Sequence, residues 1–350
     1  MISRDSARER RATALMKKMW HQVMAARPTG RVLLLLATIS CALNLGCRSS
    51  NSRTIAVIPR TTATELWESV HKGAEEAGRE TGFRIYWNAP SRDDDIERQI
   101  EMVERVIDDR PAGLVLAPDH YLALVGSVRH ALSRKIPIVL ISSSLSVPPG
   151  KGLSYILNDE HEMGRLAALR VGMLLKDKRK ATVGIVGLER DAMSNIVRAQ
   201  SFESALHAKF PQISIVARET GSSNIAELQQ VTRQMLIDNP RLDALLSLDV
   251  VATTGSLSVL RAMRKMGSLK LIGCDQDQDL ILFLRQGEID SIVVQDSNEM
   301  GARAVRWIAA RTRGESIPDK VEITPVLVTG SNIDTPEVQR LLSANWRLSR

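Results

Sequence analysis

Short apolar runs alternate with helix-like patterns along most of this chain of 350 residues. The run at 54–59 is followed by apolar residues three or four positions apart, which form one face of a helix: Leu66, Val70, Gly73 and Ala77. Gly82 then stands where a left-handed helix cap favours glycine. A second helix stripe runs from Ile96 to Ile107, with Ser91 at its start and the acidic residues 93–95 as predicted cap and dipole partners in preference to a metal role. The repeated unit is therefore strand followed by helix.

The same alternation predicts strands at 54–59, 83–87, 113–117, 136–141, 181–186, 213–216, 244–248, 269–273 and 291–294. Nearly continuous apolar strands separated by helices favour parallel sheets with both faces covered. A single open sheet of about ten strands tends to split. We therefore expect an α/β fold of two doubly wound parallel-sheet lobes. The stretch 142–152 and the polar residues 158–160 lie where one lobe could pass to the next.

The first 47 residues have the order of a signal peptide. Residues 1–31 carry eight Lys or Arg and two acidic residues, and 32–45 then contain no charge. This apolar run of 14 residues is shorter than the roughly 20 needed to cross a bilayer. It ends at Leu45-Gly46-Cys47, which resembles a lipoprotein box with lipid on Cys47, although Asn44 replaces its usual aliphatic residue. An uncleaved anchor stays open, and translation could start at Met16 or Met24.

The leader accounts for most of the net charge of +7. From position 32 onward, basic and acidic residues nearly balance, so the basic pI is no argument for nucleic acid. Cys41 would leave with the peptide and Cys47 would carry lipid. Only Cys274 would remain as a thiol, expected as a small buried residue at a strand end.

Three polar residues in the second half each follow directly on an apolar run: Asp249, Asp275 and Gln295. In an open α/β sheet, such positions are the carboxyl ends of strands, where ligands bind. The sequence therefore predicts a site for a small polar ligand at this edge.

Seven local patterns then occur in order across 55–328. They are Trp67 six residues before Gly73, Ala117-Pro118, Asn158-Asp159 with Gly164, Arg198 four before Phe202, Asp249 six before Gly255, Gly273-Cys274-Asp275 and Val294-Gln295-Asp296. Together they resemble the type I periplasmic-binding-protein family, the sugar-binding branch that also supplies the ligand domain of lac-repressor-like regulators. The resemblance implies two lobes joined by a three-segment hinge. We expect an N-terminal lobe of 48–157 plus 297–323 and a C-terminal lobe of 158–296 plus 324–345.

The resemblance also implies the ligand contacts. Arg198, Asp249, Asp275 and Gln295 stand at positions that hydrogen-bond sugar hydroxyls, and Trp67 stands where an aromatic ring stacks on the sugar. The candidate ligand-binding residues are Thr64, Trp67, Ser142, Asn158, Arg198, Asp249, Asp275 and Gln295. The chain departs from the family at Thr64 and Asp249, where Asn is usual, and at Ser142-Ser143, where an Asp-Arg or Asp-Ser pair is usual. A second aromatic is also absent near 222–224.

A monosaccharide is the expected ligand, with another polyol or an amine that meets Asp249 and Asp275 as alternatives. Each residue also has a structural alternative. Asp249 and Asp275 could cap the helices that follow them, Arg198 could pair with Glu203 on the surface, and Trp67 could be a core residue. Trp87 and Trp307 are expected to be core residues.

Catalytic and metal patterns are incomplete. The spacing of Asp275, Asp277 and Asp279 matches positions 1, 3 and 5 of an EF-hand calcium loop. Leu280 and Gln286, however, stand at positions 6 and 12, where Gly and Glu are needed. His161-Glu162 lacks the second His of a zinc protease, and no nucleophile elbow or Walker loop occurs. We expect no enzyme activity, no cofactor and no metal.

The sequence thus predicts an exported, lipid-anchored solute-binding protein that closes on its ligand and delivers it to an ABC transporter permease. Its location would be periplasmic or otherwise extracytoplasmic, with no nucleic-acid partner. One alternative is a component that reports the ligand to a membrane sensor. Another is a lac-repressor-like regulator, but the apolar leader occupies the place of a DNA-binding headpiece.

Overall fold

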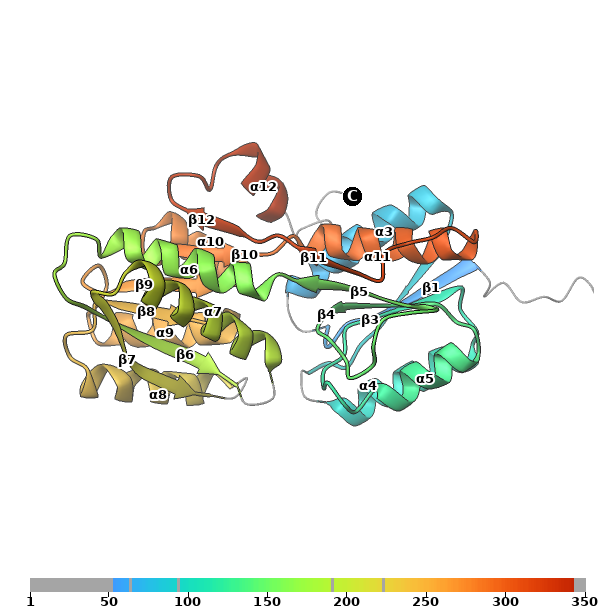
Figure 1. The fold of residues 1–350 in the computed structure, drawn as a ribbon, viewed down its shortest axis with the longest axis horizontal. Coiled ribbons are helices and arrows are strands. Elements are labelled where there is room, and N and C mark those ends of the chain that lie inside the picture. Colours follow the sequence, from blue (N-terminus) through green and yellow to red (C-terminus); the bar gives the residue numbers. More distant parts are fainter. Residues whose placement is uncertain (1–52, 63–64, 93–94, 190–191, 222–223, 343–350) are drawn as a thin grey trace, which may run out of the picture. The chain divides into compact units, whose positions relative to one another are not determined.

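The computed structural model describes residues 53–62, 65–92, 95–189, 192–221 and 224–342. Within these residues the strands form two sheets (Figure 1). The first sheet has the order β11-β5-β4-β3-β1-β2 and is parallel throughout. Its strands are β1 (Thr54–Ile58), β2 (Arg84–Trp87), β3 (Gly113–Leu116), β4 (Ile138–Ser142), β5 (Leu153–Asn158) and β11 (Lys320–Ile323).

The second sheet has the order β12-β10-β9-β8-β6-β7. Its strands are β6 (Ala181–Leu188), β7 (Ile213–Thr220), β8 (Ala244–Ser247), β9 (Lys270–Cys274), β10 (Ser291–Val294) and β12 (Val326–Thr329). All are parallel except β12, which runs antiparallel to β10. This edge strand is the one departure from the predicted parallel arrangement.

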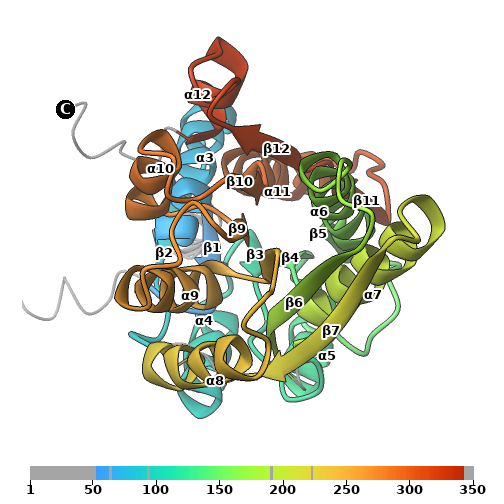
Figure 2. The same cartoon turned by 90° about the vertical axis from the view of Figure 1, so that its left-hand side faces the viewer.

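Helices cover both faces of each sheet (Figures 1 and 2). The first sheet packs against α3 (Glu65–Thr81) and α11 (Ser297–Thr312) on one face, and against α4 (Ile96–Asp108) and α5 (Val125–Ser133) on the other. The second packs against α6 (Glu160–Leu174) and α7 (Met193–Lys209) on one face. Its other face is covered by α8 (Ile225–Asp238), α9 (Val250–Ala262), α10 (Gln278–Arg285) and α12 (Pro336–Leu342). The predicted fold class is confirmed.

The chain passes between the two sheets three times, after β5, after β10 and after β11. Of the two segments expected near the first passage, 142–152 joins β4 to β5 within the first sheet. The prediction that this stretch could connect the lobes was wrong, because an unpredicted strand, β5, follows it. The chain leaves the first sheet at Asn158, directly before α6. This passage brings Asn158 and Glu160 to the edge where the site lies.

Glycines allow two helix pairs to pack closely. A Cβ built on Gly73 of α3 would lie 1.9 Å from the carbonyl oxygen of Asn298 in α11. A Cβ on Gly164 of α6 would lie 2.2 Å from the carbonyl oxygen of Arg198 in α7. Real Cβ atoms do not approach backbone so closely, so only glycine fits these crossings. The predicted cap also holds, since α3 ends at Thr81 and Gly82 follows with φ of +77°.

Candidate ligand-binding site

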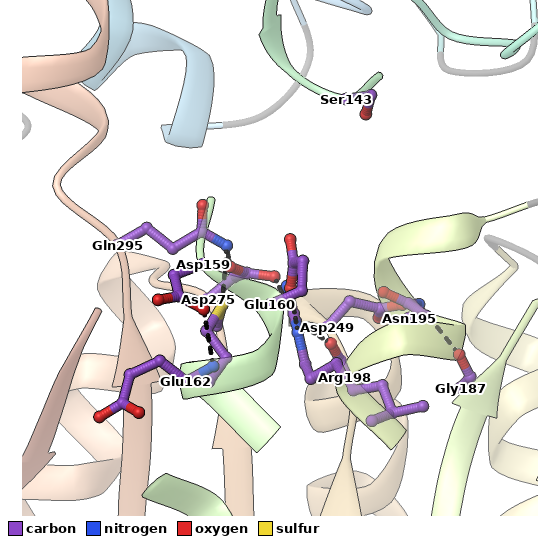
Figure 3. A network of polar contacts seen from close by, with 12 residues as sticks. Ser143, Asp159, Glu160, Glu162, Gly187, Asn195, Arg198, Asp249, Asp275 and Gln295 are labelled. Atoms are coloured by element: carbon purple, nitrogen blue, oxygen red, sulfur yellow. Dashed lines mark hydrogen bonds and ion pairs between the residues drawn. The ribbon is translucent and has the colours of Figure 1, made fainter. Parts of the chain in front are cut away.

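Arg198 is the centre of a polar network at the carboxyl end of the second sheet (Figure 3). Its side chain on α7 is buried, and its Nε donates to Oε2 of Glu160 at 2.8 Å. Its Nη1 donates to Oδ2 of Asp275 at 3.0 Å and also to the backbone carbonyl of Leu248. One guanidinium therefore joins α6, α7 and the ends of β8 and β9. The alternative in which Arg198 pairs with Glu203 on the surface was wrong; Glu203 pairs with Arg218.

Gln295 extends this network from the end of β10. Its Nε2 donates to Oδ1 of Asp275 at 2.6 Å and lies 3.2 Å from the sulfur of Met163. Asp275 has a φ of +64°, a left-handed conformation that directs the chain sharply away at the end of β9. Both carboxylate oxygens of Asp275 are thus held by protein donors. The helix after it is capped by Asp277, so the capping alternative for Asp275 was wrong.

Asp249 caps α9, as the structural alternative predicted. Its Oδ1 accepts from the backbone N–H of Ala252 at 2.7 Å, and its Oδ2 accepts from Nδ2 of Asn195 at 2.9 Å. Asn195 also donates to the carbonyl of Gly187 at 3.0 Å. Asp249 therefore lies beside the Arg198 network and links α9 to α7.

Burial raises the pKa of the Glu160 carboxyl above its ordinary value of 4.5; the Arg198 guanidinium opposes this, and the Asp275 carboxylate adds to it. Burial likewise raises the pKa of Asp249. For Arg198, burial lowers the pKa, but the carboxylates of Asp275 and Glu160 outweigh this and hold it well above its ordinary value. The guanidinium stays charged, and the carboxylates share its single positive charge.

A cavity of about 410 Å³ is lined from both sheets, and Glu160 is the residue of the Arg198 network that lines it. The first sheet contributes Ser142, whose φ is +65°, and Ser143, whose Oγ accepts a hydrogen bond from Arg60. Asn158 and Glu160 line it where the chain passes to the second sheet. Figure 3 shows Ser143 facing the network across this space. The volume lies within the range of about 300–1,000 Å³ that is usual for small-molecule sites.

The structure brings most of the predicted residues together. Arg198, Asp275 and Gln295 share one network and Asp249 lies next to it, but these four are not among the described residues that line the cavity, whereas Ser142 and Asn158 are. Trp67 is different: it is only 4 % exposed and packs in the core of the first lobe with Val70 and Ala74. Its position favours the core alternative. Thr64 and Cys47 lie outside the described residues.

Sequence reasoning missed three residues of this region: Glu160, Asn195 and Arg60. Arg60 directly follows the predicted strand 54–59, so the strand-end argument that found Asp275 could have found it. Glu160 follows Asn158-Asp159, which were noted only as a connection. No sequence signal marks Asn195, because it lies inside a helix.

Among the described residues, no three His, Cys, Asp or Glu side chains are grouped so that they could hold a metal ion. In the same part of the chain, no helix combines the length and apolarity needed to cross a membrane.

Residues 55–316 match the model of the periplasmic binding protein domain. The chain belongs to this family. One relative is a D-ribose/D-allose-binding protein of Pseudomonas aeruginosa. It is 27% identical over 317 residues, which cover 85% of this chain and 97% of the relative. The ABC transporter periplasmic-binding protein YphF of Escherichia coli is 21% identical, with 83% of this chain and 90% of the relative covered.

Two solved structures have the same fold. A carbohydrate transporter solute-binding protein of Agrobacterium radiobacter in complex with D-arabinose has a TM-score of 0.77 and 25% identity, covering 84% of this chain and all of that one. An ABC transporter solute-binding protein of Agrobacterium vitis with bound D-fucose has a TM-score of 0.75 and 29% identity. The match covers 83% of this chain and 99% of that one. The family consists of solute-binding proteins, and membership implies a periplasmic or extracytoplasmic location.

Proposed function

We propose that this protein captures a monosaccharide between its two lobes and delivers it to an ABC transporter. The observation that carries the proposal is a cavity lined from both sheets, in which Glu160 is held by the Arg198–Asp275–Gln295 network. The sugars bound by its relatives, namely D-ribose or D-allose, D-arabinose and D-fucose, support a monosaccharide as the ligand class.

The chemistry of the cavity suits a polyhydroxylated solute. Sugar hydroxyls both donate and accept hydrogen bonds, and hydrogen bonds to charged groups contribute about 1.5–3 kcal/mol each. Micromolar affinity requires about 8 kcal/mol. Glu160 offers hydrogen bonds of this charged kind, and those to neutral Asn158 and Ser142 add about 0.5–1.5 kcal/mol each, so these three residues supply part of that affinity. The Arg198 network holds the second-lobe surface in place beneath these contacts.

Closure is the proposed mechanism. A ligand that contacts Ser142 on the first lobe and Glu160 on the second stabilises the state in which both contacts form, by its differential affinity for that state. The permease then recognises the closed form. The sugar leaves chemically unchanged, so no catalytic step is proposed.

Calorimetry of the purified full chain with D-ribose, D-allose, D-arabinose and D-fucose tests this function. We expect at least one sugar to bind with micromolar affinity, and Arg198→Ala and Asp275→Ala each to abolish its binding at a temperature where thermal melting shows that the variant is still folded. Arg218→Ala, which removes an exposed ion pair with Glu203, is the matched control and should bind as wild type does. Absence of binding across a wider monosaccharide panel would refute the proposal.

Lipid attachment at Cys47 is the proposed anchor. Cys47→Ser should remove incorporation of radiolabelled palmitate and release the protein from the membrane fraction, whereas Cys41→Ser should change neither. If the Cys47→Ser variant stays in the membrane fraction, and neither it nor the wild-type protein incorporates palmitate, an uncleaved anchor would be favoured.

A further inference from the structure

Two buried acceptor atoms at the floor of the cavity have no hydrogen-bond partner among the described residues: Oδ1 of Asn158 and Oε1 of Glu160. Asn158 is only 7 % exposed, and both residues line the cavity. Leaving a buried acceptor unpaired costs about 1–3 kcal/mol. Such atoms in a cavity wall indicate that the missing partner is a donor on the ligand.

The other oxygen of Glu160 is already committed. Oε2 accepts from Nε of Arg198 at 2.8 Å and lies 2.7 Å from its Nη2. The carboxylate is therefore held in one orientation, and the side chain of Asn158 lies near enough to oppose the rise in its pKa that burial causes, while Oε1 lacks a hydrogen bond of good geometry. In Figure 3, Glu160 lies on the side of the network that faces Ser143, while Asp275 and Arg198 lie farther from Ser143. Asn158, at the end of β5, presents its free acceptor to the same cavity.

Negative charge exceeds positive charge around this point. Arg198 contacts both Glu160 and Asp275, and the hydrogen bonds to the side chain of nearby Asp249 come from neutral groups, Ala252 and Asn195. Three carboxylates thus share one guanidinium.

The described cavity wall continues the pattern. Its carboxylates, Asp119, Glu160, Glu189 and Glu322, outnumber its permanent cations, Arg60 and Lys320; two histidines, His120 and His161, also line it. Lys320 already pairs with Glu322 at 2.6 Å, and Arg60 donates to Ser143. A neutral donor would leave the excess of negative charge in place as the cavity closes, whereas a cationic donor would offset it.

We propose that Glu160 and Asn158 recognise a protonated amine, and that the ligand is an amino-substituted monosaccharide or polyol. This inference rests on the proposed function, since it names the ligand class of the same cavity. The ammonium group donates to Oε1 of Glu160 and Oδ1 of Asn158 with two of its three hydrogens. The hydroxyls of the ligand make the remaining contacts. Burial raises the pKa of Glu160, and an ammonium beside it would favour the ionised carboxylate.

Calorimetry of the full chain tests this with matched ligands. The panel is D-glucosamine, D-galactosamine and D-mannosamine, each compared with its parent hexose and its N-acetyl derivative, together with D-ribose and D-allose. An N-acetyl group keeps the nitrogen but removes its charge. We expect at least one amino sugar to bind at least about tenfold more tightly than its two neutral counterparts, as a charge-assisted hydrogen bond predicts.

Two variants locate the preference. Glu160→Gln keeps the shape of the side chain and should reduce the amino-sugar affinity at least about tenfold, a larger factor than the loss for the neutral counterparts, which keep a hydrogen bond to the amide. Glu162→Gln is the control on the same helix, because Glu162 pairs with Arg165 and does not line the cavity. It should behave as wild type does. Thermal melting of both variants checks that they fold.

The outcomes separate this inference from the function on which it rests. Wild-type protein that binds neutral sugars as tightly as amino sugars, or more tightly, overturns the amine inference and leaves the monosaccharide function standing. An amine preference that survives in Glu160→Gln also overturns the assigned residue. Absence of binding by every sugar in the panel overturns both.

Discussion

Gly164 on α6 and Arg198 on α7 lie so close that a Cβ on the glycine would approach the carbonyl oxygen of Arg198 to 2.2 Å. The absence of a side chain at Gly164 therefore sets how near α6 comes to α7. Since Glu160 begins α6 and Arg198 lies on α7, the same spacing places their side chains within hydrogen-bond distance.

Gly164→Ala should separate the two helices and weaken both stability and ligand binding. The overpacked crossing should lower the free energy of unfolding by about 1–3 kcal/mol, measured by urea denaturation. Gly126→Ala is the control, because that helical glycine on α5 has open space where a Cβ would be placed. It should leave stability unchanged or raise it by up to about 1 kcal/mol. Equal effects of the two substitutions would contradict the packing argument.

Arg198→Met should destabilise the protein severely. The substitution leaves the carboxylates of Glu160 and Asp275 without their cation, and breaking a buried ion pair typically costs about 3–5 kcal/mol. Arg218→Met removes a guanidinium whose side chain is 46% exposed, and should cost less than about 1 kcal/mol. Denaturant titrations of both variants compare the two sites. A loss at Arg198 no larger than that at Arg218 would show that the network contributes little to stability.

The raised pKa of Glu160 predicts a pH dependence with a definite sign. A carboxyl whose pKa is higher in the folded protein contributes stability that is full below its ordinary pKa of 4.5 and is lost as pH rises through the folded value. As pH falls from about 7 toward about 4, the Tm of wild type should therefore rise relative to the Tm of Glu160→Gln.

Asp243 provides the opposite sign for the same titration. Burial alone would raise its pKa, but hydrogen bonds from Lys178 and from the backbone of Thr182 lower it overall. Its contribution is present above its ordinary pKa of 3.8 and is lost as pH falls through the folded value. The Tm of wild type should thus fall relative to Asp243→Asn under acid conditions. Two variants that shift in the same direction would contradict these assignments.

Cys274 should be unreactive in the folded protein. Its side chain is fully buried at the end of β9, and burial raises the pKa of its thiol to about 12. In a Cys41→Ser, Cys47→Ser background, we expect iodoacetamide to label Cys274 at neutral pH only after denaturant is added. Rapid labelling of the native protein would show that the strand end opens to solvent.

The sequence was sufficient for the regular parts of the fold. The predicted strands at 54–59, 113–117 and 291–294 correspond to β1, β3 and β10, because each is a buried, nearly continuous apolar run. β11, with the sequence Lys-Val-Glu-Ile, is half exposed at a sheet edge and carries charges, so its apolar signal is weak. β5 includes buried Ser154, whose hydroxyl finds a partner in the carbonyl of Pro318, a contact that sequence does not reveal.

The site shows the same division. Asp249, Asp275 and Gln295 could be predicted because each ends an apolar strand, and parallel strands end at one sheet edge. Glu160 and Asn195 depend on how α6 and α7 cross, which is a tertiary relationship. The role of Trp67 could not be decided from helical spacing. It lies at the edge of the apolar face that Leu66 and Val70 form, and a residue there can face either the core or the cavity. The predicted ligand contacts remain predictions until binding is measured.

The contacts of Arg198 make the two walls of the cavity unequal. On the second lobe, the Arg198 guanidinium holds two helices and two strand ends together without a ligand. The entropy cost of ordering these groups on binding is therefore small. At the end of β4, Ser143 accepts a hydrogen bond from the single guanidinium of Arg60. We therefore expect a solute to contact the second-lobe wall first and the first-lobe wall only on closure, so that the lifetime of the first contact would limit the rate of capture.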